Sequence, residues 1–182
     1  MVKHKRKAGK STIIAVSGTP GTGKTMLSKS LALALNGKRI DCTKLIREKK
    51  LYQAYDKQRK CFIVDINAFK RAINQIIQEN NAKKQPKTLI IDSHMSHFLH
   101  TNLIDLVIIT TCNIKELGKR LKKRGYSETK IRENLDAEIF DTCCIEANEQ
   151  GHTVLKLDLS KINQKTIKTT ITKVKASLDK TN

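Results

Sequence analysis

The fold of this chain is decided near its start, by residues 13–25, which read Ile13-Ile14-Ala15-Val16-Ser17-Gly18-Thr19-Pro20-Gly21-Thr22-Gly23-Lys24-Thr25. The apolar run that opens this stretch predicts a buried parallel strand, and the helical spacing over residues 25–36 predicts a helix that ends before Gly37. Between the two, a glycine, four residues and then Gly-Lys-Thr form a phosphate-loop motif, whose backbone N–H groups wrap an anion at the helix N-terminus. The motif predicts binding of a nucleoside triphosphate but leaves open which reaction follows.

A few further side chains are expected to act with this loop. Lys24 can reach the β- and γ-phosphates, and the Thr25 hydroxyl can bind Mg²⁺. A later apolar strand ends in a carboxylate, Asp92, which can lie beside the metal ion and its waters. His94 follows two residues on, where it could orient a water molecule or a phosphate, or could be only structural.

The rest of the chain alternates short apolar runs with segments of helical spacing. The runs predict strands at 39–40, 88–92, 106–110 and 153–157, and the spacing predicts helices at 65–80, 114–123, 131–148 and 162–178. Residues 41–60 are polar and read as weakly helical. The alternation predicts an α/β fold, a five-stranded parallel sheet with helices on both faces, in a single domain over residues 11–182.

Charge is the most unusual feature of the composition. The 182 residues hold 36 Lys and Arg against 17 Asp and Glu, a formal charge of +19, which indicates an anionic partner. Because 28 of these cations are Lys and 21 residues are Ile, biased genome composition explains the excess equally well. Residues 1–10 are predicted to form a flexible basic arm. Five cysteines without a CxxC pair, and no apolar run near the roughly 20 residues of a membrane span, favour an intracellular protein with no membrane contact.

A second basic cluster surrounds Gly125 and Tyr126: Arg120, Lys122, Lys123, Arg124 and Arg132. Charge runs are usually solvated helix faces, yet three of the eight arginines fall within these 13 residues. Phosphoryl transfer needs fixed cations that neutralise the moving phosphoryl group, and a hinged segment can bring them in when substrate binds. Arg47 is a separate candidate for holding a monophosphate.

Taken in order, these segments resemble the adenylate kinase isoenzyme six family, which includes the coilin-interacting nuclear ATPase protein and archaeal adenylate kinases. The resemblance runs from about Thr12 to Leu178 and is carried by the phosphate loop, Arg47-Glu48, Leu51-Tyr52, Ile90-Ile91-Asp92-Ser93-His94-Met95-Ser96-His97, Arg120-Leu121, Arg124-Gly125-Tyr126 and Glu133-Asn134-Leu135.

The resemblance implies a P-loop nucleoside monophosphate kinase fold and the Mg²⁺-dependent reaction ATP + AMP ⇌ 2 ADP. It also implies an ATPase activity and a role in maturing the small ribosomal subunit, through a platform ribosomal protein and rRNA. A monomer is expected, cytoplasmic if archaeal and nuclear if eukaryotic. The implied monophosphate-binding segment is 41–64, and the implied short lid is 123–133.

Site residues follow from the resemblance in four groups. The implied catalytic residues are Lys24, Asp92, His94 and Arg124. Those implied to bind ATP are Gly18, Gly21, Thr22, Gly23, Lys24, Thr25, Met26, Arg124 and Lys161. Those implied to bind AMP are Arg47, Asp41 and Arg120. Mg²⁺ is assigned to Thr25 and Asp92, partly through water.

Two departures from the family pattern stand out. Thr110 occupies a place where the family commonly has arginine, and residues 57–60 are basic where the family is commonly acidic. Three hypotheses therefore remain at this point. The chain is an adenylate kinase, a nucleotide-switched binding factor for a ribosomal protein and rRNA with little kinase activity, or a kinase for a small hydroxyl substrate such as a shikimate-like acid. The Asp-x-His and Arg-Gly-Tyr motifs argue against the third.

Overall fold

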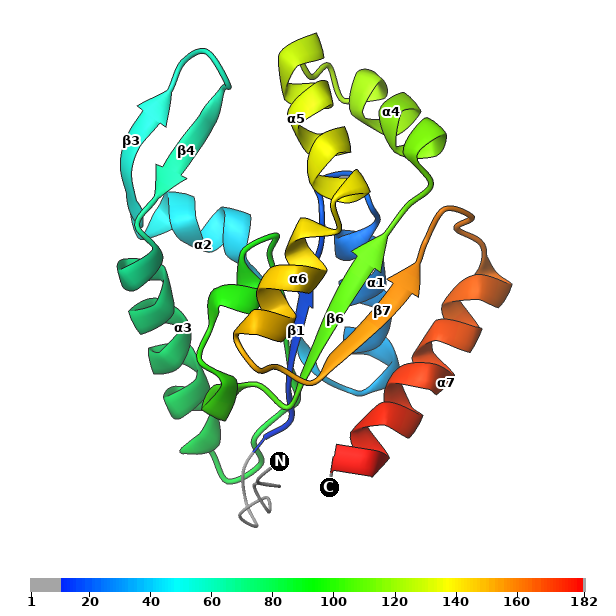
Figure 1. Cartoon of the computed structure of the whole chain (residues 1–182). Helices are drawn as coiled ribbons and strands as arrows, with labels where there is room; N and C mark the ends of the chain where they lie inside the picture. Colours follow the sequence, from blue (N-terminus) through cyan, green and yellow to red (C-terminus); the bar gives the residue numbers. More distant parts are fainter. Residues whose placement is uncertain (1–10, 182) are drawn as a thin grey trace.

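The computed structural model describes residues 11–181, so the predicted basic arm at residues 1–10 lies outside the described residues. Five parallel strands form the central sheet in the order β2-β5-β1-β6-β7 (Figure 1). Their bounds are β1 Ile13–Ser17, β2 Lys38–Asp41, β5 Leu89–Asp92, β6 Leu106–Thr111 and β7 Val154–Asp158. The predicted α/β class and its five-stranded parallel sheet are confirmed.

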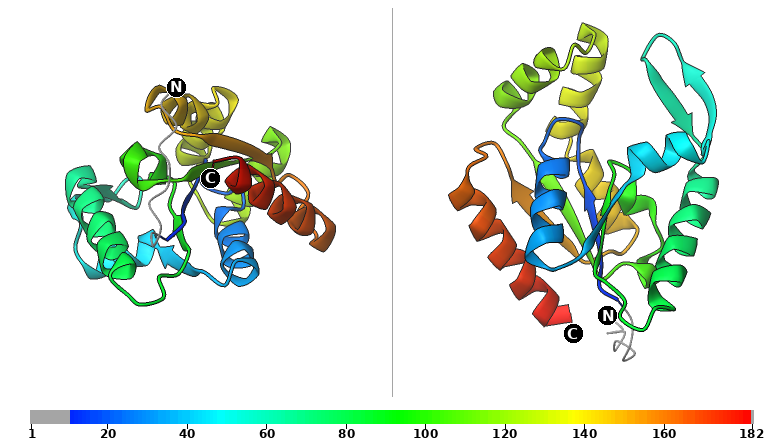
Figure 2. Two further views of the ribbon diagram at one scale, coloured as in Figure 1. Left: turned by 90° about the horizontal axis from the view of Figure 1, so that it is seen from below. Right: turned by 180° about the vertical axis from the view of Figure 1, so that it is seen from behind.

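Helices cover both faces of this sheet, as the two further views in Figure 2 show. On one face lie α1 (Lys24–Ala34) and α7 (Gln164–Thr181), packed on Ile14, Val16 and Ile90. On the other lie α2 (Cys42–Glu48), α3 (Ile66–Asn81), the 3₁₀ turn η1 (Ser96–Phe98) and α6 (Thr142–Glu149). A second 3₁₀ turn, η2, spans Thr101–Leu103. Because side chains alternate along each strand, neighbouring residues of β1 and β5 supply two separate apolar cores.

Residues 41–60 depart from the sequence-based expectation of a weakly helical segment. After the short helix α2, the chain forms an antiparallel hairpin, β3 (Tyr52–Asp56) with β4 (Cys61–Val64), that stands away from the main sheet (Figure 1). The Phe62 ring packs against Tyr52, at 4.3 Å between ring centroids, and against Tyr55 at 5.2 Å. These cross-strand aromatic contacts stabilise a segment that has little apolar periodicity of its own.

The single helix predicted at residues 131–148 is also wrong. The structure has α4 (Ile114–Lys123), then α5 (Glu128–Ile139), and a break before α6 at Asp141, whose φ of 52° is left-handed. Ser127 caps α5 by accepting a hydrogen bond from the Lys130 backbone N–H. The break lets α5 pack on α4 while α6 packs on the sheet. Between residues 11 and 181, no helix combines the length and apolar character that a membrane crossing requires.

Candidate nucleotide-binding site

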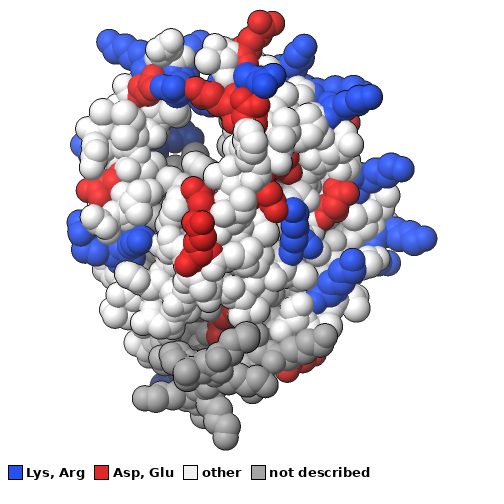
Figure 3. All heavy atoms as spheres, viewed as in Figure 1, with Lys and Arg blue, Asp and Glu red and all other residues white. Residues whose placement is uncertain are grey.

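A large cavity, of about 1760 Å³, opens at the carboxyl ends of β1, β2 and β5. Ligands of open α/β sheets bind at this edge. Its walls come from the phosphate loop with α1, from β2, α2 and the β3–β4 hairpin, and from α4, α5 and α6. Figure 3 shows the hollow between the two upper lobes of the molecule, with cationic and anionic side chains around its rim.

Within the phosphate loop, the lysine is held against its own backbone. Lys24 Nζ donates to the carbonyl oxygens of Gly18 at 2.6 Å and Thr19 at 2.9 Å. Burial lowers the pKa of Lys24 to about 8, so the ammonium is mostly charged at pH 7 although its surroundings disfavour the charge. Among the described residues, Lys24 makes no ion pair with a carboxylate. Its ammonium is therefore available to an anion bound in the loop.

Behind the loop, Thr110 at the end of β6 is fully buried. Its Oγ1 lies 2.6 Å from Thr22 Oγ1 and donates to the Ser17 carbonyl oxygen at 3.2 Å. Gly18 has a φ of +128°, and a Cβ added there would lie 2.3 Å from the Thr110 carbonyl oxygen, so only glycine fits. Thr110 thus supports the loop from behind and supplies no positive charge to the cavity.

Beside the loop, Asp92 ends β5 with its side chain only 5% exposed. Arg39 of β2 donates to Asp92 Oδ2 from Nε at 2.8 Å and from Nη2 at 2.6 Å, and to Asp41 Oδ2 from Nη2 at 2.9 Å. Asp41 also caps α2 by accepting from the Lys44 backbone N–H. Sequence analysis assigned Arg39 only to a strand. The available signal was that two neighbouring parallel strands each end in aspartate, with an arginine two residues before one of them.

Two histidines follow β5 and differ in their surroundings. The His94 side chain is exposed to the cavity, where partial desolvation by the cavity walls and the charge of Lys24 lower its pKa, so the imidazole is neutral at pH 7. His97 is buried, with Nδ1 2.6 Å from Ser17 Oγ and Nε2 2.9 Å from Glu146 Oε2. Ser17 Oγ also donates to the His94 carbonyl oxygen at 3.0 Å. His97 therefore connects α6 to the strand that carries the phosphate loop.

Cations predicted for this region are divided between two walls of the cavity. Arg47 of α2 and Arg124, which follows α4, both line it. The resemblance implies that Arg120 binds AMP, but the structure places its guanidinium against the phosphate loop. Arg120 donates to the carbonyl oxygens of Ser160 at 2.7 Å and Gly21 at 3.4 Å. Arg120 therefore joins the phosphate loop to the loop after β7.

Across the mouth of the cavity, the hairpin and α5 are joined by a charged contact. Arg59 donates to Glu133 Oε1 from Nη2 at 2.8 Å, and Lys130 Nζ donates to the Arg59 carbonyl oxygen at 2.7 Å. The basic stretch at residues 57–60 is conspicuous in the sequence, but the sequence does not show what it contacts. Glu133 lies more than 70 residues away, so the local sequence pattern could not predict this contact.

The other predicted site residues fall into two groups. Those that line the cavity are Gly21, Gly23, Lys24, Thr25, Met26, Asp41, Arg47, Asp92, His94, Arg120 and Arg124. Gly18 and Thr22 belong to the phosphate loop but are buried and do not line the cavity, whereas Lys161 and Arg132 are exposed outside the lining. Lys161 precedes Ile162, which does line the cavity and approaches Gly23. Arg132 pairs with Asp136 on the surface of α5.

The oxygen donors near the loop suit a magnesium ion. Thr25 is exposed at the first turn of α1 and lines the cavity, as do Asp92 and Asp41. Mg²⁺ takes oxygen ligands and is typically held by one or two carboxylates together with substrate phosphates. Thr25 and Asp92 would therefore hold the ion, which would neutralise phosphate charge when bound.

Several solved structures with a similar fold are described as kinases. The chain superposes on a shikimate kinase from Bacteroides thetaiotaomicron with a TM-score of 0.59, at 14% identity over 92% of this chain and 98% of that one. It superposes on a deoxyadenosine kinase from M. mycoides with a TM-score of 0.55, at 18% identity over 91% of this chain and all of that one. At such low identities, these similarities establish the fold alone.

Sequence comparison is more specific. The AAA domain family matches residues 14–141. A protein of Methanocaldococcus jannaschii described as "Putative adenylate kinase" is 38% identical over 141 residues, covering 78% of this chain and 75% of its own. One of Methanosarcina acetivorans with the same description is 36% identical over 146 residues, covering 80% and 76%. The chain therefore belongs to the adenylate-kinase-like family of these archaeal P-loop proteins.

Proposed function

We propose that this chain is a nucleoside monophosphate kinase that catalyses ATP + AMP ⇌ 2 ADP with Mg²⁺. One observation carries the proposal: the cavity presents the phosphate loop on one wall and further cations, Arg47 of α2 and Lys60 of the hairpin turn, on another. An enzyme that only hydrolyses a nucleotide binds one phosphorylated substrate and therefore needs only the phosphate-loop wall. Two anion-binding walls facing one space suit two phosphorylated substrates, one donor and one acceptor.

In the proposed reaction, an α-phosphate oxygen of AMP attacks the γ-phosphorus of ATP. The bond from that phosphorus to the β–γ bridging oxygen breaks, so that both products are ADP. Lys24 holds the β- and γ-phosphates, and Arg124 neutralises the charge of the moving phosphoryl group. Thr25 and Asp92 would hold the metal ion. The acceptor is already an anion, so no general base is required.

His94 is assigned a positioning task in this proposal. A neutral imidazole at the cavity wall can orient a water molecule or a phosphate oxygen but cannot supply a positive charge. If water occupies the acceptor side in place of AMP, the same groups support ATP hydrolysis. We propose that the β3–β4 hairpin, within residues 41–64, is the monophosphate-binding segment and that residues 123–133 are the lid.

A coupled assay tests the proposal directly. Purified protein is given ATP, Mg²⁺ and each nucleoside monophosphate in turn, beside the variants Lys24→Ala and Lys84→Ala. Lys84 is an exposed lysine outside the cavity lining, so its replacement should leave the rate unchanged. ADP formation from AMP that does not depend on Lys24 would refute the kinase proposal. Hydrolysis without transfer to any monophosphate would leave only an ATPase.

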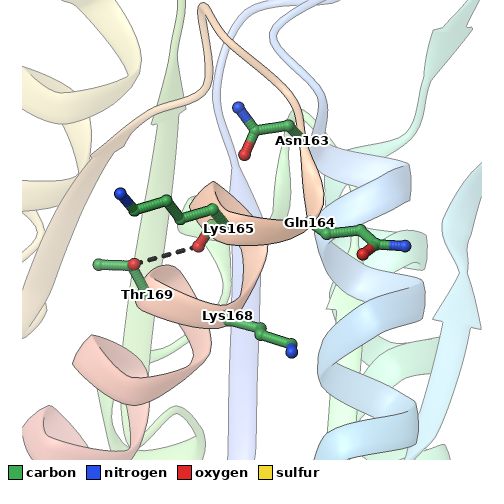
Figure 4. Close-up of a pocket in the computed structure, with 5 residues that line it drawn as sticks. All are labelled: Asn163, Gln164, Lys165, Lys168 and Thr169. Atoms are coloured by element: carbon green, nitrogen blue, oxygen red, sulfur yellow. Dashed lines mark hydrogen bonds between the residues drawn. The ribbon is translucent and has the colours of Figure 1, made fainter.

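A second candidate function is a nucleotide-switched binding factor for a ribosomal protein and rRNA. The observation that favours it is the basic start of α7, where Lys165 and Lys168 lie exposed beside Asn163 and Thr169, outside the lining of the nucleotide cavity (Figure 4). Cations that contact nucleic acid phosphates release counterions, so the affinity should fall steeply with salt. RNA binding that is independent of salt, or unaffected in Lys165→Gln/Lys168→Gln, would count against this candidate.

A further inference from the structure

Arg39 of β2 places its side chain at the candidate metal side of the cavity, beside Asp41 and Asp92. Its guanidinium donates twice to Asp92 Oδ2, at 2.8 and 2.6 Å, and once to Asp41 Oδ2, at 2.9 Å. The side chains of Arg39 and Asp92 are 18% and 5% exposed. The Asp41 side chain is 40% exposed. A planar guanidinium that donates twice to a buried carboxylate is a stronger contact than a surface ion pair.

The strand register explains why a cation is needed here. β2 pairs with β5 in parallel so that Asp41 lies directly beside Asp92. Paired residues on adjacent strands point to the same face, so these carboxylates are neighbours and repel each other. Arg39 lies two residues before Asp41 and therefore on the same face of β2, from which its long side chain reaches both carboxylates.

The same contact also occupies one of the two Asp92 carboxylate oxygens on which a metal ion could bind. Oδ2 of Asp92 accepts both donations from Arg39, and Mg²⁺ would compete with the guanidinium for it. A divalent cation placed beside an arginine is disfavoured unless new negative charge arrives with it. Phosphates of a bound nucleotide would supply that charge, both to the ion and to the guanidinium.

We propose that Arg39 is a positioning residue that acts as a resident counter-cation for Asp92 and Asp41, so that this site accepts Mg²⁺ together with a nucleotide but not free Mg²⁺. Arg39 holds the Asp92 carboxylate in place and balances its charge in the nucleotide-free protein. When phosphates enter, the guanidinium shares or releases Asp92 and turns to a phosphate oxygen. Arg39 also supplies the positive charge that Thr110 does not.

Thermal unfolding without nucleotide tests this inference. The midpoint Tm is measured from zero to tens of millimolar Mg²⁺ for the wild type, Arg39→Gln and Arg71→Gln. Arg71 is an exposed arginine of α3 and gives a matched loss of charge outside the cavity. We expect the wild type and Arg71→Gln to respond equally weakly. Arg39→Gln should have a lower Tm in chelator and recover about 3–6 °C at tenfold its Mg²⁺ dissociation constant.

Two more variants keep the test decisive. Arg39→Lys retains a positive charge but loses the planar guanidinium, so the rise in its Tm with Mg²⁺ should lie between those of the wild type and Arg39→Gln. This variant replaces Arg39→Gln in the test if Arg39→Gln does not fold. Adding Asp41→Asn to Arg39→Gln should reduce the gain, which places the ion at this carboxylate pair. A merely structural Arg39 would lower Tm equally at every Mg²⁺ concentration.

An Arg39→Gln protein whose Mg²⁺ response equals that of the wild type would overturn the inference, as would a wild type that already gains several degrees from free Mg²⁺. The inference rests on the proposed placement of the metal at Asp92 in the kinase site. Because the titration contains no nucleotide and no turnover, its failure leaves the coupled kinase assay unaffected. A failed kinase assay likewise leaves the Mg²⁺ titration interpretable.

Discussion

The pKa of Lys24, lowered by burial from 10.5 to about 8, links nucleotide affinity to pH. In the free protein the ammonium is mostly charged at pH 7 and mostly neutral at pH 9. A bound phosphate restores a favourable partner for the charged form and raises the pKa toward its ordinary value. Affinity for a nucleoside diphosphate such as ADP should therefore be greatest below pH 8 and fall as the pH rises above it.

The expected size follows from the shift. If bound Lys24 stays charged throughout, the dissociation constant scales as one plus ten to the power of pH minus 8. It then rises about tenfold between pH 7 and pH 9, which corresponds to about 1.4 kcal/mol of binding free energy. The sign is that of a lysine with a depressed pKa: binding requires little proton uptake well below pH 8 and increasing uptake as the pH rises through this value. The terminal phosphate of the nucleotide, whose second pKa is about 6, is already ionised between pH 7 and pH 9.

Isothermal titration calorimetry with Mg·ADP is the appropriate assay, at constant free Mg²⁺ and in two buffers of different ionisation enthalpy. At pH 8 the wild type should take up about half a proton on binding. Lys24→Met should bind more weakly at pH 7, show no such uptake and lose the pH dependence. Lys84→Met, at an exposed lysine, should behave as the wild type does. A wild-type dissociation constant that is flat from pH 7 to 9 would refute the reasoning.

Three other substitutions give distinct expected outcomes. Gly18→Ala forces a Cβ to within 2.3 Å of the Thr110 carbonyl oxygen at a φ of +128°, so calorimetry should show loss of ADP binding and a Tm lowered by several degrees; a normal protein would contradict the loop geometry. Phe69→Ala empties a fully buried site and should cost about 3–5 kcal/mol in urea unfolding. Arg59→Gln removes the exposed contact to Glu133, so we expect an unchanged Tm and a faster product release in stopped-flow measurements. A slower release would argue that this contact does not hold the mouth of the cavity shut.

The role of Thr110 illustrates how the site differs from the pattern expected by resemblance. A buried threonine that hydrogen-bonds to Thr22 and Ser17 cannot exchange partners with a phosphate. The candidate replacement, Arg39, comes from a strand on the other side of β5 and β1 in the sheet order. The family pattern suggests a cation at the place of Thr110, and the proposed role of Arg39 depends on strand order, which only the fold provides.

Local pattern was sufficient for the phosphate loop and the central strands. Residues 13–25 carry their own signal, because an apolar run, the glycines and the following helix are all encoded within a few neighbouring positions. The same holds for the strand that ends in Asp92. Local pattern failed at the β3–β4 hairpin and at Asp141. In the first, aromatic contacts across the strands override a polar sequence; in the second, helical spacing continues through a left-handed residue.

The amino-acid sequence by itself thus determined the fold class, the phosphate loop and the carboxylate that faces it. Tertiary structure alone decided that Arg39 meets Asp92 across 53 residues of chain, that Arg120 turns to the phosphate loop, and that Arg59 reaches Glu133. The physical reason is that a motif depends on backbone conformation within a few residues. A pair of charges depends instead on which strands are neighbours and in which register, and that is settled only when the whole core packs.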